Sequence, residues 1–195
     1  MSDLRKLLLL LGVMTLARAL WAATAPMFSG ECYYWLWNWH PAAGYFDHPP
    51  MVGLVGIMLG GRILGSTLAA RLPAIVLAIG STLAFYGLGR AMFPQGRTAW
   101  RAAALFTLAP ILDLNGMFLG PDNSLALFTT LTWLAFWRAA EQPERLTGWI
   151  AAGAAGGLAL LCKFHAWVLL PPLYLFLLFS PAHRGALRRP GPWLA

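Results

Sequence analysis

Residues 51–65, MVGLVGIMLGGRILG, decide how the rest of this 195-residue chain is arranged. The segment is apolar, but it is short, rich in glycine and interrupted by Arg62. A membrane-spanning helix needs about 20 predominantly apolar residues, with about 17 as the practical minimum. Whether this segment crosses a membrane or lies along its surface therefore sets the orientation of every segment that follows.

The composition predicts an all-α integral membrane protein. Hydrophobic residues make up 59% of the chain, against about 45–50% in soluble domains. The basic and then apolar N-terminal segment resembles a signal peptide, and Ala23-Thr24-Ala25 resembles its cleavage site. Because Pro26 directly after this site should hinder cleavage, we expect the first helix to be retained. The net charge of +7 comes from residues scattered in short loops, which argues against a nucleic-acid partner. The apolar runs lie at 7–26, 51–65, 71–90, 102–119, 124–140, 148–162 and 165–180.

The distribution of basic residues favours an interfacial position for 51–65. If this segment does not cross, most lysines and arginines fall on one side, and only Arg62, Arg71 and Lys163 fall on the other. Because basic loops are retained in the cytoplasm, we predict about six spans, a cytoplasmic N-terminus and a first periplasmic loop at 27–66 with interfacial helices. The basic side then holds Arg5, Lys6, Arg90, Arg97, Arg101, Arg138, Arg145, Arg184, Arg188 and Arg189.

The first outer loop is the strongest candidate for a functional site. Residues 30–50, GECYYWLWNWHPAAGYFDHPP, place acids and histidines among aromatic residues. Ionisable groups near lipid are costly, so their clustering indicates a site, while the aromatic rings suit a membrane interface. In the predicted topology, this loop shares the outer face with Asp122 and Lys163.

Each of these residues also has a structural interpretation. Glu31 could be a solvated acid, Asp47 and Asp122 could cap helices, and Lys163 could extend toward the headgroups. Taken together, they suit a lipid substrate that bears a phosphate. The lysine would pair with the phosphate, and a carboxylate would act as a base or hold a divalent ion.

Two further features concern the interior and the cysteines. Asp113 lies among apolar residues, and we expect it to pair with Arg18 or Arg71 inside the bundle. Cys32 and Cys162 both fall on the outer side, and spacing alone leaves their pairing open.

The order and spacing of several motifs resemble a known family. ECYYWLW (31–37) and GYFDHPP (44–50) are similar to the first outer loop of bacterial glycosyltransferases of the dolichyl-phosphate-mannose protein mannosyltransferase type, to which the aminoarabinose transferases of lipid A are related. GPDN (120–123), LCKF (161–164) and RRPGPW (188–193) are similar to later elements of that family. The resemblance extends over essentially the whole chain.

This resemblance implies a GT-C fold and transfer of a sugar from a polyprenyl-phosphate donor at the periplasmic face of the inner membrane. Carried over to this chain, Glu31, Asp47 and Asp122 are the candidate catalytic residues, and Asp47 is the candidate ligand of a divalent metal ion. Lys163 would contact the donor phosphate. The candidate substrate-binding residues are Lys163, His48, Tyr34 and Tyr45.

Two departures from the family pattern define an alternative to an active enzyme. Gly30 stands where the family usually has an aspartate, so Glu31 would have to replace the expected base. Family members also run to several hundred residues, so 1–195 is expected to be one transmembrane domain, the N-terminal part of such an enzyme. The alternative is a catalytically inactive truncated protein or a partner subunit. A small transporter fits less well, because its polar groups would lie near the middle of the membrane.

Overall fold

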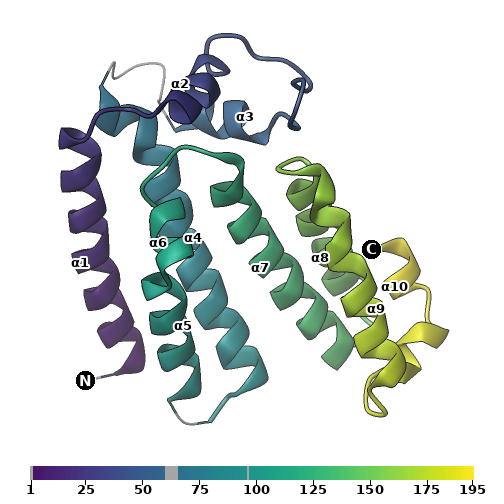
Figure 1. The fold of residues 1–195 in the computed structure, drawn as a ribbon. Coiled ribbons are helices and arrows are strands. Elements are labelled where there is room, and N and C mark those ends of the chain that lie inside the picture. Colours follow the sequence, from purple (N-terminus) through teal and green to yellow (C-terminus); the bar gives the residue numbers. More distant parts are fainter. Residues whose placement is uncertain (1, 60–65, 96) are drawn as a thin grey trace.

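The protein is described by a computed structural model that covers residues 2–59, 66–95 and 97–195. Within these ranges the regular structure is entirely helical. The long helices stand side by side in a bundle, with α1 and α5 on one side of α4 and with α7 on the other (Figure 1). Helix α8 packs against α7 and continues the row. The elements are α1 (Asp3–Thr24), α4 (Thr67–Met92), α5 (Thr98–Leu108), α6 (Pro110–Asn115), α7 (Pro121–Glu141), α8 (Leu146–Leu160), η1 (Phe164–Leu169) and α9 (Leu170–Phe179).

Two of these helices are long and apolar enough to cross a membrane. Helix α1 has 22 residues and α4 has 26, each with a mean hydropathy of 1.8 over its most apolar window. Among the other helices, α7 has 21 residues but is not apolar enough. The α5–α6 segment is broken, because α5 ends at Leu108, Ala109 is extended, and Pro110 starts α6. A proline at this position cannot donate the backbone hydrogen bond of a continuing helix. The number of six spans therefore stays a prediction.

Local sequence signals explain where the helices start. The Ser66 hydroxyl accepts a hydrogen bond from the backbone N–H of Ala69 at the start of α4, as serine commonly does at an N-cap. Helix α7 starts with Pro121 in its first turn, a position where proline is favourable. The Asn123 side chain accepts from the backbone N–H of Gly120 and closes this turn.

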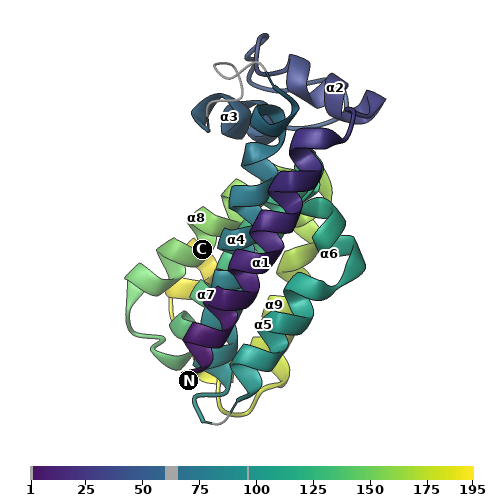
Figure 2. The ribbon, with the colours of Figure 1, turned by 90° about the vertical axis from the view of Figure 1, so that its left-hand side faces the viewer.

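Two short helices lie across one end of the bundle. Helices α2 (Ser29–Leu36) and α3 (Met51–Met58) are located where α1 ends and α4 begins, close to the turn between α6 and α7 (Figures 1 and 2). The described part of the 51–65 segment therefore does not run through the bundle; residues 60–65 lie outside the described residues. The first turn of α1 and the last turns of α4 and α7 lie at the opposite end (Figure 1). This arrangement agrees with an interfacial segment, and the orientation in the membrane stays a prediction.

The C-terminal part folds back onto α8. Helices η2 (Arg184–Arg188) and α10 (Gly191–Leu194) follow α9, and α10 packs against α8. Trp149 is fully buried there and meets Phe136 edge-on at 5.4 Å between ring centroids. This packing attaches the last helices to α8.

The interior contains the predicted pair between α1 and the α5–α6 region. Arg18 is 1% exposed, and its Nη2 lies 2.9 Å from Oδ1 of Asp113. Of the two partners expected for Asp113, Arg18 is the observed one. The prediction that Asp113 pairs with an arginine is thus confirmed.

Candidate functional site

The loop between α2 and α3 is held in shape by its aromatic residues. The rings of Trp37 and Tyr45 stack 3.7 Å apart with an interplanar angle of 5°. The Tyr45 hydroxyl donates to the backbone carbonyls of Trp37 at 3.2 Å and His40 at 2.9 Å. A Cβ atom at Gly53 of α3 would lie 2.9 Å from the Tyr45 hydroxyl, so glycine allows α3 to approach this loop closely. Tyr45, predicted to bind substrate, thus has clear structural contacts.

Glu31 lies in the first turn of α2 and is deeply buried. Its side chain is 3% exposed, and its two carboxylate oxygens accept from Nε and Nη2 of Arg71 at 2.8 and 2.7 Å. The backbone N–H groups of Phe28 and Leu119 also donate to it, each at 3.2 Å. A carboxylate with four donors is poorly placed to accept a proton from a substrate. The geometry favours a structural role for Glu31, and its predicted catalytic role stays untested.

Arg71 is the partner that sequence reasoning missed at this position. It is fully buried at the start of α4, and its remaining N–H groups donate to the carbonyls of Ala22, Ala25 and Pro26 at 2.8–3.2 Å. Its guanidinium also lies 4.4 Å from the centroid of the Trp21 ring. The sequence did offer a signal for this partner, because Arg71 stands at the edge of an apolar run. A cation buried there requires an acid or several carbonyls as partners. Arg71 and Glu31 together join α1, α2, α4 and the turn before α7.

Asp47 presents an exposed carboxylate beside two tyrosines. The hydroxyl of Tyr33 donates to Oδ1 of Asp47 at 2.9 Å. This hydrogen bond is the main cause that raises the pKa of Tyr33 above its usual 10.0. The pKa of Tyr34 is raised chiefly by burial, and also by the negative charges of Asp47 and Asp122. Tyr34 is therefore within electrostatic range of both carboxylates, and its ring lies 5.9 Å from that of His48.

Asp122 and Lys163 form the second part of the site. Nζ of Lys163 lies 2.7 Å from Oδ1 of Asp122, and the two side chains are 21% and 46% exposed. Asp122 lies in the first turn of α7, where a negative charge is favourable. The backbone N–H of Met51 donates to the carbonyl of Leu161 at 3.1 Å, which attaches α3 to the turn that carries Lys163. Three loops that are distant in sequence are thus joined at one end of the bundle.

Clusters of metal-ligating side chains are absent from the described residues. No group of three or more His, Cys, Asp or Glu side chains in these ranges is placed to hold an ion, and Asp47 belongs to no such group. The predicted metal at Asp47 stays untested. Cys32 is exposed and Cys162 is buried, and both are free thiols.

Gly30 faces open space. A Cβ atom built on this residue meets no atom within 4 Å, so a larger side chain would fit there. The position where the resemblance led us to expect an aspartate therefore has room for a larger side chain, while the neighbouring Glu31 is paired with Arg71.

Comparison of the sequence with known protein families identifies the family of this helical chain. The model of the dolichyl-phosphate-mannose-protein mannosyltransferase family matches residues 47–195. The chain therefore belongs to this family. No solved structure matches the chain significantly.

Several curated relatives carry related names. The undecaprenyl phosphate-alpha-4-amino-4-deoxy-L-arabinose arabinosyl transferase of Pseudomonas aeruginosa (strain UCBPP-PA14) is 30% identical over 130 residues, covering 64% of this chain and 24% of that protein. The protein of the same name from Pseudomonas savastanoi pv. phaseolicola is 31% identical, with the same coverage of both chains. The lipid A galacturonosyltransferase RgtD of Rhizobium johnstonii is 28% identical over 164 residues, covering 83% of this chain and 34% of that protein. The chain thus spans about a quarter to a third of the length of these relatives.

Proposed function

We propose that the chain forms the donor-binding end of a glycosyltransferase that takes a sugar from a polyprenyl-phosphate at the periplasmic face. The observation that carries this proposal is the partly exposed pair of Lys163 and Asp122, held beside the exposed Asp47 and the tyrosines of α2. A lysine cation suits a phosphate, and aromatic rings suit a sugar at a membrane interface. By similarity to the named relatives, we propose a lipid A-type glycolipid as the acceptor.

In the proposed reaction, an acceptor hydroxyl oxygen forms a bond to the anomeric carbon of the donor sugar. The bond from that carbon to the phosphate oxygen breaks, and its electron pair leaves with the lipid phosphate. Lys163 would stabilise the charge of this phosphate, and Asp122 would orient Lys163. The hydroxyl proton passes to a carboxylate, for which we propose Asp47, because the carboxylate of Glu31 already accepts four hydrogen bonds.

The vacant space at Gly30 favours a second candidate function, a catalytically silent partner subunit. Such a protein would keep the donor-binding end of the fold and lack the carboxylate that the family usually has on α2. Binding of the donor would then survive without transfer.

Transfer of a labelled polyprenyl-phosphate sugar in membranes distinguishes these candidates. We expect Lys163→Ala and Asp47→Ala to lose most of the transfer, while Lys6→Ala, a lysine at the opposite end of the bundle, keeps it. Equal transfer by all four proteins would refute the proposed site. If the wild type transfers nothing but binds the donor, and Lys163→Ala binds it more weakly, the silent function is supported.

A further inference from the structure

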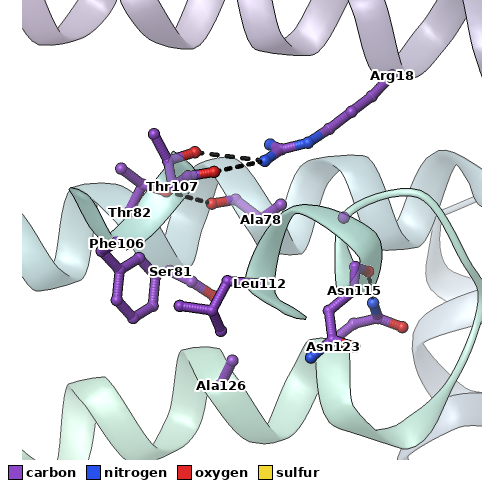
Figure 3. A pocket seen from close by; sticks show the side chains of 11 residues that line it. Arg18, Ala78, Ser81, Thr82, Phe106, Thr107, Leu112, Asn115, Asn123 and Ala126 are labelled. Atoms are coloured by element: carbon purple, nitrogen blue, oxygen red, sulfur yellow. Dashed lines mark hydrogen bonds between the residues drawn. The ribbon is translucent and has the colours of Figure 1, made fainter. Parts of the chain in front are cut away.

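A small cavity lies between the helices of the bundle, next to the turn that carries Asp122. It is lined by residues of α1, α4, α5, α6 and α7 and has a volume of about 20 Å³ (Figure 3). Six of the eleven residues that line it have side chains with hydrogen-bonding groups. These polar residues are Arg18, Ser81, Thr82, Thr107, Asn115 and Asn123.

Arg18 lines this cavity, and one nitrogen of its guanidinium has no hydrogen-bond partner in the described part of the chain. Its Nε donates to Asp113 at 3.0 Å, and its Nη2 donates to the carbonyl and hydroxyl oxygens of Thr107, both at 3.3 Å. Its Nη1 is buried and has no hydrogen-bond partner among the described residues. Buried donors in native proteins are almost always bonded to protein or to ordered water, and the demand is stronger inside a membrane, where lipid supplies no acceptor.

We propose that this cavity binds an ordered water molecule that accepts a hydrogen bond from Nη1 of Arg18. The volume exceeds the roughly 10–15 Å³ that one water requires. The Thr82 hydroxyl donates to the carbonyl of Ala78 at 2.9 Å, which leaves its oxygen free to accept a hydrogen bond from the water. An anion fits less well, because the charge of Arg18 is already balanced by Asp113.

The position of the water gives it a structural consequence. Asn123 lines the cavity from the first turn of α7, and its side chain also bonds the carbonyl of Asn115 and the N–H of Gly120. The water would therefore fill the space beneath the turn that carries Asp122. It would link α1 and α4 at the level where Ala109 breaks the helix between α5 and α6.

A crystal structure of the intact chain, grown in a lipid phase with bromide in place of chloride, tests this proposal. We expect a density peak within hydrogen-bonding distance of Nη1 of Arg18 and of the Thr82 hydroxyl, with no anomalous signal. A bromide signal at this peak would assign an anion site and overturn the proposal. An empty cavity, with Nη1 bonded to a protein atom, would overturn it as well.

Two matched variants provide a second test in solution. Thr82 and Thr130 are both buried, and each donates to the carbonyl four residues before it, at 2.9 and 2.8 Å. Only Thr82 of these two lines the cavity. We therefore expect Thr82→Val to lower the Tm more than Thr130→Val does. Equal shifts of the Tm in the two variants would count against a water bound to Thr82.

Discussion

Replacing Arg71 by methionine should destabilise the protein strongly. The substitution keeps an apolar stem of similar length and removes five hydrogen bonds, two to Glu31 and three to backbone carbonyls. It leaves the Glu31 carboxylate, 3% exposed, with only the N–H groups of Phe28 and Leu119 as donors. Removing one partner of a buried ion pair costs about 3–5 kcal/mol. Domains have a total stability of roughly 5–15 kcal/mol, so the loss would be a large share.

The pair of Lys6 and Asp3 supplies the control for this prediction. Its atoms are 3.2 Å apart, but the side chains are 26% and 27% exposed, and such surface pairs contribute about 0–1 kcal/mol. The assay is unfolding in detergent, followed by tryptophan fluorescence, for the wild type, Arg71→Met and Lys6→Met. We also expect the double variant Arg71→Met/Glu31→Leu to recover part of the stability, because no buried charge is left unpaired. If Arg71→Met unfolds at the same point as Lys6→Met, the reasoning is refuted.

Measurements of unfolding and of sugar transfer on a Glu31 variant distinguish a structural role of this residue from a catalytic one. We expect Glu31→Gln to lower the free energy of unfolding, with sugar transfer per folded molecule little changed. A Glu31→Gln protein with wild-type stability and no transfer would instead identify Glu31 as the catalytic base and would overturn the assignment to Asp47.

Three other predictions follow from the α2–α3 end. Gly30→Asp should fold normally, because a Cβ there meets no atom within 4 Å, and it should raise sugar transfer; a lower Tm or unchanged transfer would contradict this. Gly53→Ala should lower the Tm, because its Cβ would lie 2.9 Å from the Tyr45 hydroxyl, whereas Gly44→Ala, where nothing lies within 4 Å, is the control. The raised pKa values of Tyr33 and Tyr34 mean that the folded state favours the neutral phenols. The two tyrosines therefore contribute to stability below pH 10, and this contribution declines as the pH rises through the raised pKa values. Asp47→Asn should shift the ultraviolet titration of these tyrosines to lower pH; an unchanged titration would disprove the influence of Asp47.

The sequence predicted the general arrangement because that arrangement depends on local composition. Apolar runs and the distribution of arginines placed α2, α3 and the turns before α7 and η1 at one end of the bundle. The pairing of Asp113 was also predictable, since an acid among apolar residues needs a cation. The choice of Arg18 over Arg71 was not, because that choice depends on how α1 and α4 rotate toward their neighbours.

The roles of the two acids in the α2–α3 region were harder to predict. Glu31 and Asp47 look alike in the sequence, yet one is buried against Arg71 and the other is exposed beside Tyr33. The burial of Glu31 depends on contacts with residues 40 and 88 positions away in the sequence. Such contacts leave no periodic signal in the chain. The direct pairing of Lys163 with Asp122 is likewise a contact between residues that are distant in the sequence.

The contacts at the α2–α3 end of the bundle also set an order for biosynthesis. Glu31 leaves the ribosome early, but its bond to Leu119 spans 88 residues and requires the turn before α7 to be in place. Lys163 can meet Asp122 only after α8 has been synthesised. The α2–α3 end is therefore completed late, although its first helices are made early. A nascent chain stalled before residue 163 would present Asp122 without the lysine that pairs with it.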